Sequence, residues 1–168
     1  MTTPRVCALL FALGLGTTLP AHAQWQPTGA LARIPVYQDC DDTGGDVAVS
    51  RLDPPAIYVC PAIVRFIRRH DQGAEHFYLV HEYGHIAQHT ADEAAADCWA
   101  AEALANARNG RRYLDAMLEH LRKRPDEARA GYGTPSDRAE TIRRCASEAR
   151  PDIVLEPRPM STPTRRRR

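Results

Sequence analysis

The sequence predicts an α+β fold that is mostly α-helical, with a small sheet near the N-terminus and a metal site shared by two helices. Short segments with strand character, separated by Pro, Gly and Asp, precede residue 61. The later part of the chain divides into five helical segments between glycine and proline breaks. A length of 168 residues, with 43% hydrophobic and 26% charged side chains, suits one soluble domain with a modest core.

The expected strands are short, and the expected helices fill most of the remaining domain. Residues 32–37 and 47–50 are predicted to be extended, with a polar, glycine-containing turn between them, and residues 56–60 to form a strand. The helices are expected at 62–70, 75–89, 93–109, 111–123 and 137–149.

Residues 1–23 have the three parts of a secretory signal peptide. Arg5 supplies the positive region, Val6 to Leu19 is an apolar stretch, and Ala21-His22-Ala23 is a small-x-small cleavage site. The alternative is a membrane anchor, but the apolar stretch is shorter than the ~20 residues that span a bilayer. We therefore expect an exported protein, periplasmic or secreted, whose mature chain has no transmembrane segment.

The mature chain is expected to be one domain, 24–150, followed by a disordered tail, 151–168. The tail has four prolines, no aromatic residue and a terminal run from Arg165 to Arg168, so it cannot build a core. The net charge of the whole chain is only +1. No broad basic field is present, so nucleic acid is not an expected partner. The sequence leaves the oligomeric state open.

Four cysteines remain after the predicted signal peptide: Cys40, Cys60, Cys98 and Cys145. An even number in an exported chain predicts two disulfides, for which three pairings are possible. Cys40–Cys60 and Cys98–Cys145 are favoured because each pair joins segments that can be neighbours. The alternative, a zinc ion held by all four thiolates, is disfavoured because no C-x-x-C pair occurs.

The segment His81-Glu82-Tyr83-Gly84-His85 has the pattern H-E-x-x-H. On a helix, two histidines four residues apart share one face, so both imidazoles can bind one zinc ion. Glu82 is then placed to take a proton from a water activated by the metal. The alternative is a histidine-rich helix that faces solvent. Apolar residues just upstream, at 77, 79 and 80, instead predict a buried helix.

A catalytic zinc site needs a third protein ligand, and four acidic or histidine residues follow the motif. His89 lies ~12 Å from His81 along a straight helix, and no glycine between His85 and His89 would bend the chain back. His89 is therefore expected at the rim. Asp92 is a further candidate, and Glu93 and Asp97 are better placed because they share one face of the next helix.

Glu93 is the predicted third ligand, and Asp97 is predicted to bind the second ring nitrogen of His81. A turn over 88–92 would let the helix that carries them fold back beside the first. The alternative is that Thr90-x-x-Glu93 is a capping box, in which Glu93 bonds only to the Thr90 backbone. The metal interpretation is favoured because the two histidines have no equally good third partner.

H-E-x-x-H followed by E-x-x-x-D, here Glu93 to Asp97, resembles the gluzincin metallopeptidases. The likeness is to small soluble bacterial relatives of the CAAX prenyl endopeptidases, and it covers about 57–145. It implies a zincin-like fold with Glu93 as third ligand and Asp97 orienting the first histidine. Thr134-Pro135 leading to Arg138 looks like the family's His-Pro segment, with Thr134 in place of the histidine.

The resemblance also implies an edge strand for the substrate backbone and a donor for the oxyanion. Residues 57–60 are the strand candidate, and Tyr132 and Arg138 are the donor candidates; the alternatives are a loop anchor for Tyr132 and a surface charge for Arg138. The expected function is zinc-dependent endopeptidase activity on a peptide or protein substrate, with one Zn²⁺ per chain. Two alternatives are a weak or inactive zincin-fold chaperone of the cell envelope and a zinc-stabilised structural domain. The intact Glu82 favours the enzyme.

Overall fold

The computed structural model describes residues 25–129 and 131–149. The predicted signal peptide, 1–23, and the predicted tail, 151–168, lie outside the described residues. Within them the fold is α+β and mostly helical, with five α-helices and one three-stranded sheet, as the sequence predicts. No described helix is long and apolar enough to cross a membrane.

The strands precede all the α-helices along the chain. Short 3-10 turns lie at Leu31–Arg33 and Asp41–Thr43. The first predicted strand therefore begins as a turn, and only its end is extended. The elements are β1 (Val36–Gln38), β2 (Ala48–Leu52), β3 (Pro55–Val59), α1 (Pro61–His70), α2 (Ala74–Gln88), α3 (Glu93–Ala105), α4 (Arg111–Arg122) and α5 (Pro135–Glu148).

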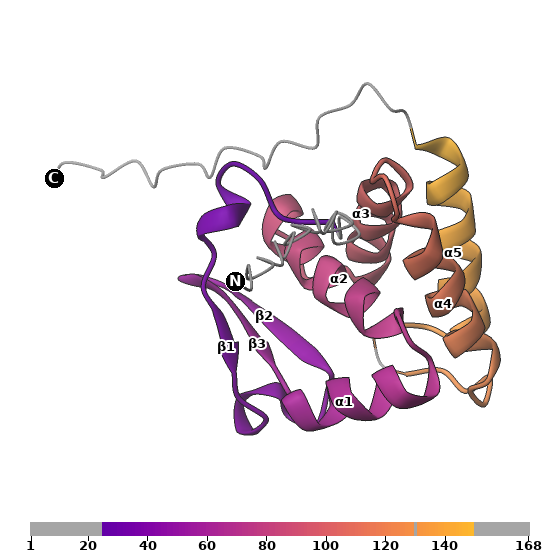
Figure 1. Ribbon diagram of the computed structural model, residues 1–168, viewed down its shortest axis with the longest axis horizontal. Helices are drawn as coiled ribbons and strands as arrows, with labels where there is room; N and C mark the ends of the chain where they lie inside the picture. The colour runs from indigo at the N-terminus through magenta and orange to yellow at the C-terminus, as the bar shows by residue number, and fades with distance from the viewer. Residues whose placement is uncertain (1–24, 130, 150–168) are drawn as a thin grey trace, which may run out of the picture.

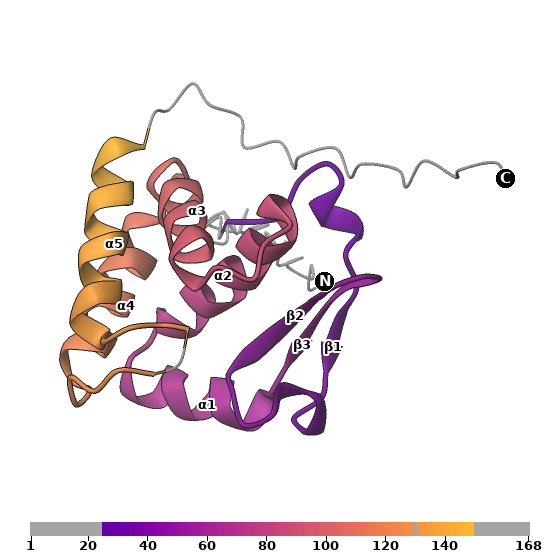
Figure 2. The same cartoon turned by 180° about the vertical axis from the view of Figure 1, so that it is seen from behind.

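The sheet lies at one end of the molecule and α4 and α5 at the other, with α2 and α3 between them (Figures 1 and 2). Its strand order is β1-β3-β2, with β1 parallel and β2 antiparallel to the central strand. The prediction that 57–60 forms the edge strand is wrong, because both edges of β3 are paired. Ile57 is fully buried, and a central position covers it better than an edge. β2 is the edge strand that packs on α2.

The close contact between α2 and α3 depends on small residues. A Cβ placed on Gly84 would lie 2.8 Å from the backbone oxygen of Ala96, so only glycine permits this approach. Ala96 and Ala100 on the facing helix are fully buried. Large apolar side chains of α2, such as Phe77 and Val80, fill the core next to this contact. The histidine motif is thereby held against the start of α3.

Two disulfides join separate parts of the fold in the predicted pairing. Cys40–Cys60 links the turn after β1 to the start of α1, and Cys98–Cys145 links α3 to α5. They close loops of 20 and 47 residues. Loops of this length correspond to about 3 and 4 kcal/mol of stabilisation through the unfolded chain. Both bonds fit an oxidising location.

Candidate metal centre

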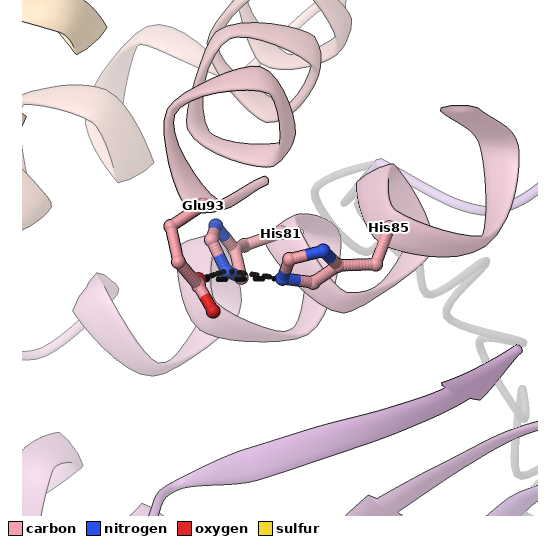
Figure 3. Close-up of side chains that lie close together, drawn as sticks. All are labelled: His81, His85 and Glu93. Atoms are coloured by element: carbon pink, nitrogen blue, oxygen red, sulfur yellow. Dashed lines mark hydrogen bonds and ion pairs between the residues drawn. The ribbon is translucent and has the colours of Figure 1, made fainter. Parts of the chain in front are cut away.

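Three ligand atoms from two helices converge on one point (Figure 3). The Nε2 atoms of His81 and His85 are 3.1 Å apart. The Oε2 atom of Glu93 lies 3.0 Å from the first and 3.3 Å from the second. These three residues form the group that can hold a metal ion among the described part of the chain.

The spacing of these atoms matches one face of a coordination tetrahedron. With metal–ligand distances of ~2.0–2.1 Å, tetrahedral ligands lie ~3.3 Å from one another. All three observed separations are close to this value. One small ion can therefore contact all three atoms and keep a fourth position for another ligand.

The hydrogen bond made by Nδ1 of each histidine sets the tautomer of the ring and thereby the role of its Nε2 atom. Nδ1 of His81 lies 2.8 Å from Oδ1 of Asp97, and Nδ1 of His85 lies 2.9 Å from the carbonyl oxygen of Thr90. Both partners are acceptors, so each Nδ1 carries the proton and donates it. Where neither ring carries a second proton, both Nε2 atoms direct lone pairs toward the carboxylate of Glu93. Three acceptors at this distance repel one another unless a proton or a metal ion lies among them, and so the arrangement fits a cation.

Asp97 is held by an arginine from a third helix. Its side chain is 2% exposed, and Arg138 on α5 donates from Nε to Oδ2 at 2.8 Å and from Nη2 to Oδ1 at 2.7 Å. Burial alone would raise the pKa of Asp97, but hydrogen bonds from Arg138 and His81 lower it below its usual range. Asp97 therefore stays ionised and keeps accepting from His81.

The charges of the centre favour a bound cation at neutral pH. Burial alone would lower the pKa of His81, but hydrogen bonds to Asp97 and Glu93 raise it to about 9. Burial would raise the pKa of Glu93, but the two histidines lower it to about 2. The carboxylates are thus ionised, and either a proton or a metal ion balances them.

The turn between α2 and α3 places Glu93 without a glycine. His89 itself takes the left-handed conformation, with φ of 48°, and its N–H donates to the His85 and Ile86 carbonyls. A non-glycine residue in this region costs about 1 kcal/mol or more. His89 thus acts as the turn residue without being a glycine. The predicted turn over 88–92 is present, and His89 lies outside the group of three ligands.

Asp92, and not Thr90, caps the helix that carries Glu93. The Asp92 carboxylate accepts from the N–H groups of Ala94 and Ala95, while the Thr90 hydroxyl accepts from the Asp92 N–H. The predicted alternative, a capping box between Thr90 and Glu93, does not form. Because Asp92 caps α3, the side chain of Glu93 is free to reach the two histidines.

Glu82 and Tyr132 lie next to the three ligands. Glu82 is buried and lines two adjoining cavities. The Tyr132 ring stacks beside the His81 ring, with centroids 6.4 Å apart and planes 22° apart. Burial and the nearby carboxylates of Glu93 and Glu82 raise the pKa of Tyr132. Its hydroxyl therefore keeps its proton and can donate a hydrogen bond.

The two cavities share Ala48, Glu82 and Tyr132 and extend from them in different directions. The β2 cavity, about 160 Å³, runs along β2 beside His85 and Glu93. The α1 cavity, about 320 Å³, extends toward α1 and the end of α4. Larger hollows of about 490 and 500 Å³ lie elsewhere, and no metal ligand lines them. The convergence of two imidazoles and a carboxylate, and not cavity size, distinguishes this place as the candidate centre.

The sequence analysis predicted which ligand and supporting residues come together, but it did not predict that Arg138 binds Asp97. His81, His85, Glu93 and Asp97 come together as the motifs indicate. Arg138 was predicted as a donor to substrate, with a surface charge as the alternative, whereas it is buried and its guanidinium is bound to Asp97. A buried acid predicts a cationic partner, but no local pattern selects a residue 41 positions away.

Comparisons with models of known families, with curated proteins and with solved structures found no match to this chain.

Proposed function

We propose that the protein is a zinc-dependent peptide hydrolase of the gluzincin type, with a zincin-like arrangement of its site. The observation that carries this proposal is the triangle of His81, His85 and Glu93 atoms, with both histidines oriented by acceptors. Two imidazoles and one carboxylate are a donor set typical of catalytic zinc, and three protein ligands leave one position open. The site-specific chemistry, rather than the fold, supports the assignment.

The chain's own groups divide the work of hydrolysis between them. A bound zinc ion would polarise the substrate carbonyl and lower the pKa of a water to ~7. Glu82 takes the proton of the attacking water and passes it to the leaving amine. The hydroxyl of Tyr132 donates to the carbonyl oxygen as negative charge develops there. Asp97, fixed by Arg138, keeps His81 in the tautomer that binds metal.

The substrate backbone is expected to pair with β2. This strand has a free edge in the described sheet, and its residues line the cavity beside His85 and Glu93. Extended peptides commonly add to such an edge. Antiparallel pairing is the more stable geometry. A peptide in that direction places its N-terminal side near Leu52 and its C-terminal side near Ala48.

The two disulfides also support the proposal that the protein works outside the cytoplasm, where such bonds persist.

The function is tested by metal analysis together with hydrolysis of an unfolded protein substrate. Wild type should contain about one zinc per chain and cleave the substrate. Glu82→Gln should keep zinc and the fold but lose cleavage by a factor of at least about 100. Zinc without cleavage in wild type would favour the binding or chaperone module; undiminished cleavage by Glu82→Gln would exclude Glu82 as the base.

A further inference from the structure

The α1 cavity borders Glu82 but contains none of the metal ligands except His81. Its wall on the α1 side is apolar and includes Ile63, Phe66 and Ile67. Phe66 is 55% exposed, so its ring is open to contact by a ligand in the cavity. The cavity therefore offers apolar contact to whatever occupies the space next to Glu82.

The lining of the α1 cavity also includes three arginines with different partners. Arg138 is bound to Asp97, and Arg129 forms an ion pair with Asp46 at 2.9 Å. Arg124 forms no ion pair with any described residue. Its contacts are with a hydroxyl and a ring nitrogen: Nη1 lies 3.5 Å from the Tyr78 hydroxyl and 3.3 Å from Nε2 of His120. One positive charge in this lining is thus left without a carboxylate.

Arg124 is exposed, and its two contacts orient its guanidinium beside the cavity without cancelling its charge. Nδ1 of His120 donates to Asp71 at 2.8 Å, so Nε2 is the acceptor that faces Arg124. The charge of Asp71 is already balanced by Lys123. An arginine held in this way can bind a carboxylate by two parallel hydrogen bonds.

The direction of the substrate places its C-terminal half at this arginine. The α1 cavity includes Asp46, Val47 and Ala48, which are the start of β2 and the residues before it. A peptide antiparallel to β2 runs toward this end after it passes Glu82. The residues that follow the scissile bond therefore enter the α1 cavity, while those that precede it lie in the β2 cavity.

We propose that the α1 cavity recognises a carboxylate on the C-terminal side of the scissile bond, with Arg124 as the residue that determines this specificity. This inference rests on the proposed hydrolase. The carboxylate comes either from an Asp or Glu side chain or from the C-terminus of a short peptide, because both present the same two oxygens to the guanidinium.

A mixed synthetic peptide library, prepared with free and with amidated C-termini, tests the proposal with the full zinc-loaded protein. Mass spectrometry of the products gives the residues on both sides of each cleaved bond. Asp and Glu should be enriched in the first two positions after the bond. Enrichment that persists in amidated peptides identifies the side chain as the source. Cleavage near the C-terminus that amidation abolishes identifies the chain end.

Variants then assign the preference to one residue. For matched peptides with Glu or Gln after the scissile bond, wild type should show kcat/KM about 5- to 10-fold higher for Glu. Arg124→Gln should remove this ratio by slowing only the Glu peptide, and Arg124→Glu should favour a Lys peptide. Arg122→Gln is the matched control, because Arg122 is exposed, pairs with Glu119 and lies outside the cavity. A ratio that Arg124→Gln leaves unchanged overturns the proposal.

A binding measurement separates this inference from the proposed hydrolase. Glu82→Gln protein is passed over the same immobilised Glu and Gln peptides, and the dissociation constants are compared with those of Glu82→Gln/Arg124→Gln. Tighter binding of the Glu peptide that depends on Arg124 supports the cavity assignment, even where wild type cleaves no peptide and the hydrolase proposal fails. Equal binding of both peptides by both proteins overturns the assignment, even where cleavage is observed.

Discussion

The helices and the sheet contribute different things to the candidate site. All three ligands and both supporting residues belong to helices: His81 and His85 to α2, Glu93 and Asp97 to α3, and Arg138 to α5. The sheet contributes no ligand, and only its edge strand β2 borders the centre. The geometry of the metal site therefore depends on helix packing, whereas the proposed substrate path depends on how the sheet lies against α2.

This difference means that metal binding and substrate binding can be disturbed separately. Cys98–Cys145 connects the two helices that carry Asp97 and Arg138. Cys40–Cys60 connects the region of the sheet to α1, remote from the ligands in sequence. Changes in the helical part should alter zinc affinity, and changes near the sheet should alter only stability or peptide binding.

The largest effect is expected from the ligands themselves. His81→Ala or His85→Ala should weaken zinc binding by more than about 100-fold, because each removes a direct ligand rather than a supporting contact. Glu93→Ala should also weaken it strongly. His89→Ala is the control on the same segment, because the His89 side chain is exposed and is not among the three ligands, and alanine keeps the N–H that bonds to the His85 and Ile86 carbonyls. Competition with a chelator measures the affinities, and zinc loss in His89→Ala but not in Glu93→Ala would refute the ligand assignment.

Removing each disulfide in turn allows the helical part and the region of the sheet to be compared directly. Replacing Cys98 and Cys145 by serine should lower the free energy of unfolding by about 4 kcal/mol and weaken zinc binding, since α3 and α5 lose their link. Replacing Cys40 and Cys60 should cost about 3 kcal/mol and leave zinc affinity unchanged. Urea unfolding and chelator competition on both double variants measure this. Equal zinc affinities in the two variants would mean that the helical part needs no covalent support.

Gly84 tests the contact between α2 and α3. Gly84→Val should destabilise the fold by about 2–3 kcal/mol, because its Cβ would meet the backbone of Ala96 and force the helices apart. Zinc affinity should fall with it, because Glu93 would move away from the histidines. Ala94→Val is the control, since Ala94 is exposed on α3. Thermal unfolding with and without zinc distinguishes the two variants, and normal stability of Gly84→Val would contradict the tight contact.

Local spacing made most of the metal centre predictable from the sequence. Residues four apart on one helix share a face whatever the rest of the fold does, and so His81 with His85, and Glu93 with Asp97, were paired correctly. The Arg138–Asp97 pair joins residues far apart in the chain, and no periodicity encodes it. Strand order was likewise hidden, because a short apolar strand has the same pattern at the centre or at the edge of a sheet.

The left-handed conformation of His89 could not be predicted from the sequence for a different reason. Glycine is the usual residue at such a position, so the sequence predicts the turn over 88–92 but does not indicate that His89 takes the left-handed conformation. The close contact around Gly84 and the cap formed by Asp92 instead hold the two helices together and impose the turn. Tertiary packing here outweighs a local preference of about 1 kcal/mol.

The Asp97–Arg138 pair tests how far the helical part supports its ligands. Asp97→Ala should weaken zinc binding about 10- to 100-fold while all three ligands remain. Arg138→Met should have a similar effect, because a buried Asp97 without its cation binds a proton more readily and no longer fixes His81. The double variant should be no worse than Asp97→Ala alone, since Arg138 acts through Asp97. Arg143→Met, exposed on the same helix, is the control; additive losses in the double variant would assign Arg138 a separate role.

The smallest effect concerns His76, which lies on α2 but outside the metal centre. Its ring packs on Tyr113 of α4, and its buried Nε2 has no hydrogen-bond partner among the described residues. Burial lowers the pKa of His76 to about 4. A histidine whose pKa is lower in the folded than in the unfolded state stabilises the fold above pH ~6.5, and this contribution is lost as the pH falls toward 4.

Metal-free protein should therefore lose about 1–2 kcal/mol of unfolding free energy between pH 7 and about pH 5. The other shifted groups of the centre add little in this window. The lowered pKa of Glu93 acts at more acidic pH. The raised pKa of His81 stabilises the fold fully below ~6.5 and loses this effect as the pH rises toward 9, so it opposes the loss only near pH 7 and does so equally in wild type and in His76→Leu. His76→Leu should flatten the pH dependence measured by urea unfolding in the presence of chelator, whereas His70→Leu, which changes an exposed histidine, should not. If the unfolding free energy of His76→Leu depends on pH as strongly as that of wild type, the acid sensitivity comes from the ligand residues His81 and His85 and not from His76. Stability and metal binding could then not be disturbed separately on α2.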